Sequence, residues 1–165
     1  MRKILFKAKR EDNGEWITGG SIIQFLDNGE MSFYMPNFNE KCICVHDEKT
    51  DNIEKFEHGI FYKIKPEMIC QYTGINDKDG NQIFENDIVQ YIHIKYPEPY
   101  LEPISIKPTK YKGNYKVEFV NTKFTYGLRL RKKSIHFPIT KSSIDNHGVK
   151  IIRNIFDNPE LLEEP

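Results

Sequence analysis

The sequence contains very little alanine, the residue with the strongest intrinsic preference for helix. Ala8 is the only alanine among 165 residues, whereas there are 11 phenylalanines and 9 tyrosines. Aromatic and β-branched side chains suit pleated, half-buried strands. The composition therefore favours a mainly β fold, although an AT-rich genome would also deplete alanine and enrich Ile, Lys, Asn and Phe.

Long apolar runs are also missing. No stretch approaches the roughly 20 residues that a helix needs to span a bilayer, and the apolar segment at residues 4–6 is too short for a signal peptide. We therefore expect a cytoplasmic protein with no membrane partner. The three cysteines, Cys42, Cys44 and Cys70, are an odd number, and we expect them to be reduced thiols.

Net charge is absent as well, because 24 Lys and Arg residues balance 24 Asp and Glu residues. The distribution is nevertheless uneven. Residues 107–133 hold nine Lys and Arg residues and a single acidic one, Glu118, which gives +8 there and −8 in the rest of the chain. Such an asymmetry indicates an anionic partner or self-association.

Turn signals divide the chain into many short β-prone segments. Asn-Gly pairs begin at Asn13 and Asn28, and each predicts a hairpin turn. Pro36 is expected to end its strand or to hold it at a sheet edge. Asn158 and Pro159 predict the start of a short C-terminal helix, since they suit the N-cap and first helical positions.

These segments predict a mainly β protein in two parts. Residues 1–66 would form an N-terminal β subdomain, and residues 67–165, with about five strands, an SH3-like small barrel. Residues 95–112 contain four prolines, so we interpret them as a proline-rich insertion in the second part.

The clearest hairpin covers residues 115–131. Tyr115 and Val117 alternate with polar residues on its first strand, and Tyr126 and Leu128 do so on its second, which predicts one apolar and one basic face. The basic face could contact nucleic-acid phosphates or another partner, with Tyr111 or Tyr115 stacking on bases if exposed. The candidate contacts are Lys116, Lys123, Arg129, Arg131, Lys132 and Lys133. The alternative without a function is a strand face exposed to solvent, or one neutralised by acidic residues in the rest of the chain or by a neighbouring subunit.

Two further motifs resemble those of a known family. Residues 71–89 begin with Gln-Tyr-Thr-Gly, continue through an Asp-rich turn and end in Asp-Ile-Val, and residues 153–162 read Arg-Asn-Ile-Phe-Asp-Asn-Pro-Glu-Leu-Leu. Both resemble the signature of the YopX family of phage and prophage proteins. Asn86 and Arg153 stand where that family usually has glycine, and Arg rarely adopts positive φ. We expect structural roles for the matching residues Tyr72, Gly74, Asp77, Gly80, Asp87, Asn154 and Pro159.

The resemblance implies a mostly β fold and a phage or prophage origin, and it carries over no catalytic residues. The residues add little chemistry of their own. Cys42, Cys44 and His46 share one face of a strand but lack metal-site spacing, and the Asp77–Gly80 turn fails the calcium-loop pattern. We therefore expect no enzyme, metal, cofactor or small-molecule substrate.

Two functional hypotheses remain. The first is a non-enzymatic phage or prophage accessory protein in the cytoplasm of the bacterial host, which binds a macromolecule such as a host or phage protein and self-associates. The alternative is a nucleic-acid-binding module that uses the basic face of the 115–131 hairpin. An enzyme with a site assembled from distant residues is a third and weaker possibility.

Overall fold

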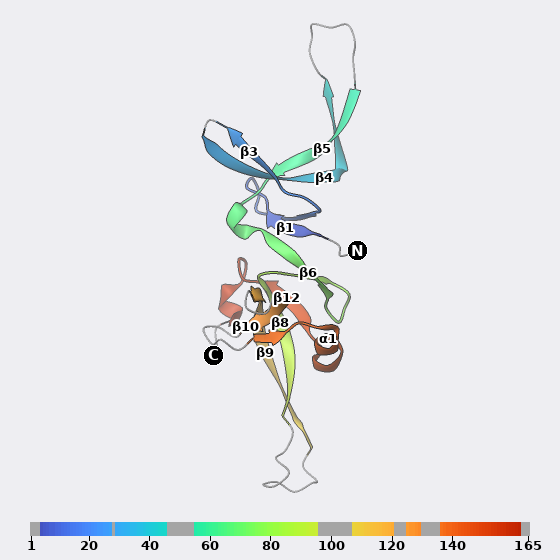
Figure 1. Cartoon of the computed structure of the whole chain (residues 1–165), viewed down its shortest axis with the longest axis vertical. Helices are drawn as coiled ribbons and strands as arrows, with labels where there is room; N and C mark the ends of the chain where they lie inside the picture. Colours follow the sequence, from blue (N-terminus) through green and yellow to red (C-terminus); the bar gives the residue numbers. More distant parts are fainter. Residues whose placement is uncertain are drawn as a thin grey trace. The chain divides into compact units, whose positions relative to one another are not determined.

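The computed structural model describes residues 4–27, 29–45, 55–95, 107–120, 125–129 and 136–162. The chain divides into two compact units, with the division between Gln71 and Tyr72. Strands dominate both units (Figure 1), so the prediction of a mainly β fold is confirmed. In the described residues no helix has the length and apolar character needed to cross a membrane.

The first unit is built from antiparallel strands. Strand β1 pairs with β2, and β4 lies between β3 and β5 in a three-stranded sheet. A small core forms around Ala8, Met35 and Ile64, all nearly inaccessible to solvent. The elements are β1 (Phe6–Lys9), β2 (Trp16–Gly19), β3 (Ile23–Asp27), β4 (Glu30–Val45), β5 (Lys55–Lys63) and the 3-10 helix η1 (Pro66–Met68).

Pro36 does not end its strand. Strand β4 continues through it to Val45, so the separate strand expected near Cys42 belongs to the same element. Strand β3 pairs with β4 only up to the Ile23–Tyr34 pair, and Pro36 pairs with Phe61 of β5. Beyond Tyr34 the described strands flank β4 on one side only, which fits a residue that lacks a backbone N–H.

The second unit contains a five-stranded antiparallel sheet in the order β11-β10-β9-β8-β12. The described residues of the second part contain seven strands rather than about five, because β6 and β7 belong to another sheet. The SH3-like closure stays a prediction. Strand β6 begins in the first unit, where Cys70 and Gln71 pair with β1, and its later residues pair with β7. The elements are β6 (Cys70–Asn76), β7 (Gln82–Phe84), β8 (Asp87–Lys95), β9 (Thr109–Val120), β10 (Thr125–Arg129), β11 (His136–Pro138), α1 (Lys141–His147), β12 (Lys150–Asn154) and the 3-10 helix η2 (Pro159–Leu162).

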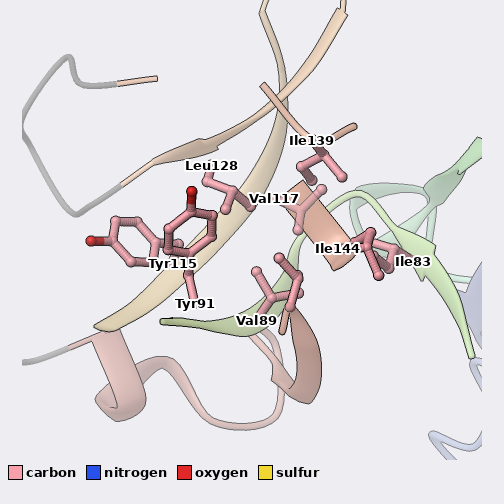
Figure 2. Packing of buried hydrophobic residues seen from close by; sticks show 9 residues of the cluster. Ile83, Val89, Tyr91, Tyr115, Val117, Leu128, Ile139 and Ile144 are labelled. Atoms are coloured by element: carbon pink, nitrogen blue, oxygen red, sulfur yellow. The ribbon is translucent and has the colours of Figure 1, made fainter. Parts of the chain in front are cut away.

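The core of this unit lies on one face of the sheet. Val89, Val117 and Leu128 of three neighbouring strands pack with Ile144 of α1 (Figure 2), and all four are buried. Val117 pairs directly with Leu128 across β9 and β10, so the two residues share one face of the hairpin, as expected.

Helix α1 was not expected from the sequence. Thr140 caps it: its side chain accepts a hydrogen bond from the backbone N–H of Ser143, and the Ser143 side chain accepts one from Thr140. Gly148 ends it in the left-handed conformation. At the predicted C-terminal helix, Pro159 begins the single 3-10 turn η2 rather than an α-helix.

Strand β9 is longer than expected. It begins at Thr109, and its first four residues pair with residues 92–95 of β8. Lys95 and residues 109–112 are therefore strand, which corrects the boundaries of the insertion predicted at 95–112. Residues 96–106 lie outside the described part of the chain.

Candidate nucleic-acid interface

Strands β8 and β9 continue past the core of the second unit as a two-stranded ribbon (Figure 1). We call residues 92–95 and 107–112 the arm. Four antiparallel pairs build it, from Ile92–Lys112 at its base to Lys95–Thr109. Because side chains alternate along each strand, the arm has two distinct faces.

One face of the arm carries rings. His93 of β8 and Tyr111 of β9 are directly paired and stack with their ring centroids 4.7 Å apart and their planes at 10°. His93 also hydrogen-bonds through Nε2 to the hydroxyl of Tyr115. Tyr91 lies 4.8 Å from His93, centroid to centroid. This set of rings extends the apolar face of the sheet outward onto the arm.

Helix α1 supports the inner end of this ring cluster. His147, its last residue, stacks on Tyr91 with centroids 4.4 Å apart and planes at 17°. Its Nδ1 donates a hydrogen bond to the carbonyl oxygen of Ile92 at 2.9 Å. The side chain at the C-terminus of α1 is thus held against the base of the arm.

Exposure falls steeply along the cluster. Tyr111 is 56% exposed, whereas Tyr115, four residues later on the same face, is 5% exposed. Of the two tyrosines considered for base stacking, the structure leaves only Tyr111 accessible.

Burial shifts the pKa values of three groups in the cluster. Burial lowers the pKa of His93, and the neighbouring His147 lowers it further. Burial also raises the pKa of the Tyr91 and Tyr115 hydroxyls. In each of these three groups burial favours the neutral form.

Positive charge surrounds these rings. Lys95, Lys107, Lys110 and Lys112 are exposed, and residues 88–95 and 107–117 include no acidic residue. Within the described residues none of these four lysines forms an ion pair. As far as the described residues go, the arm therefore combines cations that have no acidic partner with an accessible aromatic ring.

The basic face expected around residues 115–131 looks different. Arg129 is paired with Lys116 across the strands, and its Nη1 lies 3.3 Å from the Glu118 carboxylate. Ile88 and Val120, on the same side of the sheet, are buried. This side is partly covered, and Arg129 is already engaged with an acidic residue. Lys123, Arg131, Lys132 and Lys133 lie outside the described residues.

The motif at residues 71–89 folds around Asp77. Its Oδ1 accepts hydrogen bonds from the backbone N–H groups of Asp79 and Asn81, both at 2.9 Å. Its Oδ2 accepts from the Asn81 side chain and, 74 residues away, from the N–H of Ile151. These bonds together lower the pKa of Asp77, although burial opposes its ionisation. Gly80 closes the turn with φ of 88°.

The remaining motif residues also have structural partners. The Tyr72 hydroxyl donates to Oδ1 of Asn76 at 2.6 Å, and Gly74 has φ of 88°. Asn86 takes the positive φ, 64°, that a glycine would supply. Arg153 lies within strand β12 and has no positive φ, as expected of an arginine.

Potential metal ligands do not cluster in the part of the chain that the structure describes. Among the described residues no three His, Cys, Asp or Glu side chains come together. Cys42 and Cys44 lie in β4, Cys70 is buried in β6, and His46 lies outside the described residues. In the Asp-rich turn, Asp79 pairs with Lys78 and Lys150 at 2.8 and 2.9 Å rather than facing a cation site.

A hollow of about 430 Å³ lies between β6 and α1. Its wall includes Tyr72 and Asp77, whose pKa values are shifted in opposite directions. Both side chains are committed to the structural hydrogen bonds described above. Lys141 and Asp145 at its rim are exposed.

Sequence reasoning missed His93 and Lys95 as partners of Tyr111. A signal was present, because His93 and Lys95 continue the alternation of β8 while Tyr111, Gly113 and Tyr115 continue that of β9. The prolines that follow residue 95 led to the interpretation of residues 95–112 as an insertion, so this alternation was overlooked.

Comparison with known proteins matches this chain to a protein family and to solved structures. The family model described as YopX protein matches residues 5–163, nearly the whole chain. Among solved structures, the crystal structure of protein EF1440 from Enterococcus faecalis is similar, with a TM-score of 0.53 and 20% identity over 97% of this chain and 98% of that chain. At that identity the likeness concerns the fold alone. No curated protein matches.

Proposed function

This chain belongs to the YopX family, and from that premise we propose that it is a non-enzymatic accessory protein of a phage or prophage that binds nucleic acid through the arm. The proposal includes the cytoplasm of the bacterial host, where nucleic acid is available as a partner. It moves the contact surface from the 115–131 hairpin to its neighbour, residues 92–95 and 107–112.

One observation supports it above the others. Lys95, Lys107, Lys110 and Lys112 are exposed on a protruding ribbon whose described residues bring no acidic side chain to pair with them. Lysines that neutralise phosphates release condensed counterions, which is the main source of non-specific affinity for nucleic acid. A two-stranded ribbon also has the dimensions to enter a major groove.

Salt dependence tests the proposal. Fluorescence anisotropy would follow labelled single- and double-stranded DNA and RNA between roughly 50 and 200 mM salt. Four phosphate contacts predict a slope of log K against log salt of about −3 to −4. Absence of binding at the lowest salt would refute the proposal.

Matched variants locate the contact. Lys110→Gln with Lys112→Gln should make the slope shallower by about 1.4 to 1.8, since two contacts are lost. The control, Lys141→Gln with Arg153→Gln, removes the same charge from exposed positions in α1 and β12. An equal loss in the control would show that net charge, and not the arm, governs binding.

Self-association is the second candidate. Leu26 and Met31 form a cross-strand pair on the β3–β4 hairpin and are 72% and 56% exposed. Apolar side chains grouped in this way favour a second copy of the chain as partner. Sedimentation velocity over a concentration series tests this: Leu26→Lys should lower the mass of the assembly. A monomer at every concentration would rule the candidate out.

A further inference from the structure

His93 and Tyr111 form a stacked pair on the arm. Phosphate binding by the lysines would not require these rings. We infer that the arm binds single-stranded nucleic acid by stacking an unpaired base on the exposed face of Tyr111. This inference rests on the proposed function, and it names the class of nucleic acid and the residue that selects it.

Tyr111 offers a ring surface to solvent. Its ring stacks on His93 at 4.7 Å with planes at 10°, yet it stays 56% exposed. Because His93 covers one face, much of the exposed area belongs to the other. A tyrosine ring held in this way can accept a base of any identity, since every base has a π-face.

His93, which covers one face of the Tyr111 ring, is held in place by several contacts. His93 hydrogen-bonds to the hydroxyl of Tyr115, which is 5% exposed and packs in the core. It also contacts the ring of Tyr91, which His147 stacks against from α1. Ring orientation is therefore fixed before any ligand arrives, so binding loses little side-chain freedom.

Gly113 makes this arrangement possible. It faces Tyr91 across the strands, and the Tyr115 ring lies over it: a Cβ at position 113 would stand 2.7 Å from Cε2 of Tyr115. Without a side chain there, the ring of Tyr115 leans toward the arm. Its hydroxyl then reaches His93, two residues beyond Tyr91 on the same face.

Charge lies beside the stacking surface. Lys95 follows His93 by two residues and therefore shares its face, and its partner across the ribbon is Thr109, two residues before Tyr111. Lys110 and Lys112 flank Tyr111 in sequence, on the other face. A strand whose base rests on Tyr111 would thus pass within reach of cations for its phosphates, as in known single-strand binders.

A duplex cannot use this feature in the same way. Paired bases stack on one another, so an aromatic ring reaches a base face only after that base is unstacked at an energetic cost. The lysines of the arm, in contrast, serve single and double strands alike. Tyr111 should therefore create a preference for unpaired bases over the background binding that the lysines provide.

Three probes separate these effects: an oligothymidine of about 12 nucleotides, an abasic strand of the same length and phosphate number, and the corresponding duplex, which carries twice as many phosphates. Each variant is compared with the wild type on the same probe. Tyr111→Ala should weaken oligothymidine binding by about 5- to 150-fold and leave the affinity for the duplex and the abasic strand unchanged. Tyr111→Phe, which keeps the ring, should bind oligothymidine like the wild type. Phe119→Ala removes another exposed aromatic side chain of β9, 40% exposed, and serves as the matched control.

The outcomes distinguish this inference from the proposed function. If Tyr111→Ala binds oligothymidine as tightly as the wild type while the lysine variants bind weakly, stacking is refuted and the nucleic-acid proposal stands. If Tyr111→Ala weakens all three probes equally, the ring selects no base and the inference also fails. If the wild type binds none of the probes, both fail. Circular dichroism melts of each variant check that the fold is retained.

Discussion

Asn154 donates a hydrogen bond through Nδ2 to Oδ1 of Asp87 at 3.1 Å, across 67 residues of sequence. The second oxygen of Asp87 accepts from the N–H of Phe84 at 2.8 Å, and Oδ1 of Asn154 accepts from the N–H of Phe156 at 3.0 Å. Asp87 and Asn154 are 1% and 5% exposed. The two motifs that identify the family therefore meet in one buried hydrogen-bonded pair that stabilises a turn at each end.

This pair should behave as a coupled unit. Asp87→Ala and Asn154→Ala should each lower the free energy of unfolding by about 2 to 3 kcal/mol, because each leaves buried donors or acceptors without partners. The double variant should lose about 1 kcal/mol less than the sum of the two. Urea unfolding at constant m-value measures all three. Strictly additive losses would show that the bond between the two side chains contributes nothing of its own.

The stability that Asp77 contributes should be lost in acid. Its folded pKa lies below the ordinary 3.8, so its contribution is complete above that value and is lost as pH falls through the folded pKa. Asp77→Ala should cost about 3 kcal/mol at pH 7, since four donors lose their acceptor. Asp77→Asn should cost less, because an amide oxygen can replace Oδ1.

Urea midpoints at pH 7 and pH 3 measure this effect. The Asp77→Asn variant should show a smaller difference between the two midpoints than the wild type. An identical difference in both proteins would mean that Asp77 does not govern acid sensitivity.

The stability that His93 contributes should depend on pH in the opposite direction from that of a surface histidine near a carboxylate. Burial and His147 lower its folded pKa below the ordinary 6.5, so the unfolded chain binds protons first as pH falls. Stability should therefore be complete above about pH 6.5 and should decline as pH falls toward the folded pKa. Titration of the histidine ring signals by NMR measures the shift directly. His93→Gln should flatten the pH dependence of unfolding, and a His93 pKa above 6.5 would contradict the assignment.

Gly113 should tolerate no side chain. Gly113→Ala places a Cβ 2.7 Å from Cε2 of Tyr115, and the forced shift of that ring should cost about 1 to 3 kcal/mol. Gly20→Ala is the control, because the nearest atom to its Cβ would be 3.9 Å away and its φ is not positive. Thermal melts compare the two variants. Equal melting temperatures would show that Tyr115 moves aside freely.

Local signals explain what could be predicted of the fold. The turn at Gly14, with φ of 72°, follows from an Asn-Gly pair, and the shared face of Val117 and Leu128 follows from alternation that holds within each strand. Helix α1 was missed because seven residues are too few to reveal a helical period. Its capping box and the glycine at 148 were visible in the sequence without an apolar stripe to support them.

The candidate site was harder to predict than the fold. Alternation places Tyr111 and Tyr115 on the same face, but it does not say where along a ribbon the core ends. Packing against Val89, Tyr91 and the rest of the cluster buries Tyr115, while Tyr111 lies beyond that cluster. Arg129 likewise seemed available until the strand register brought it to Glu118.

By itself, the sequence determined the β-rich character, the turns, the alternating faces of β9 and β10, and the family, because each depends on residues close together in the chain or on motifs. Tertiary structure alone decided that Asp77 holds Ile151, that Asp87 meets Asn154, and that Tyr111 remains exposed. Those outcomes depend on which distant backbone and side-chain groups are brought within hydrogen-bonding or van der Waals distance. Local patterns restrict such encounters but do not specify them.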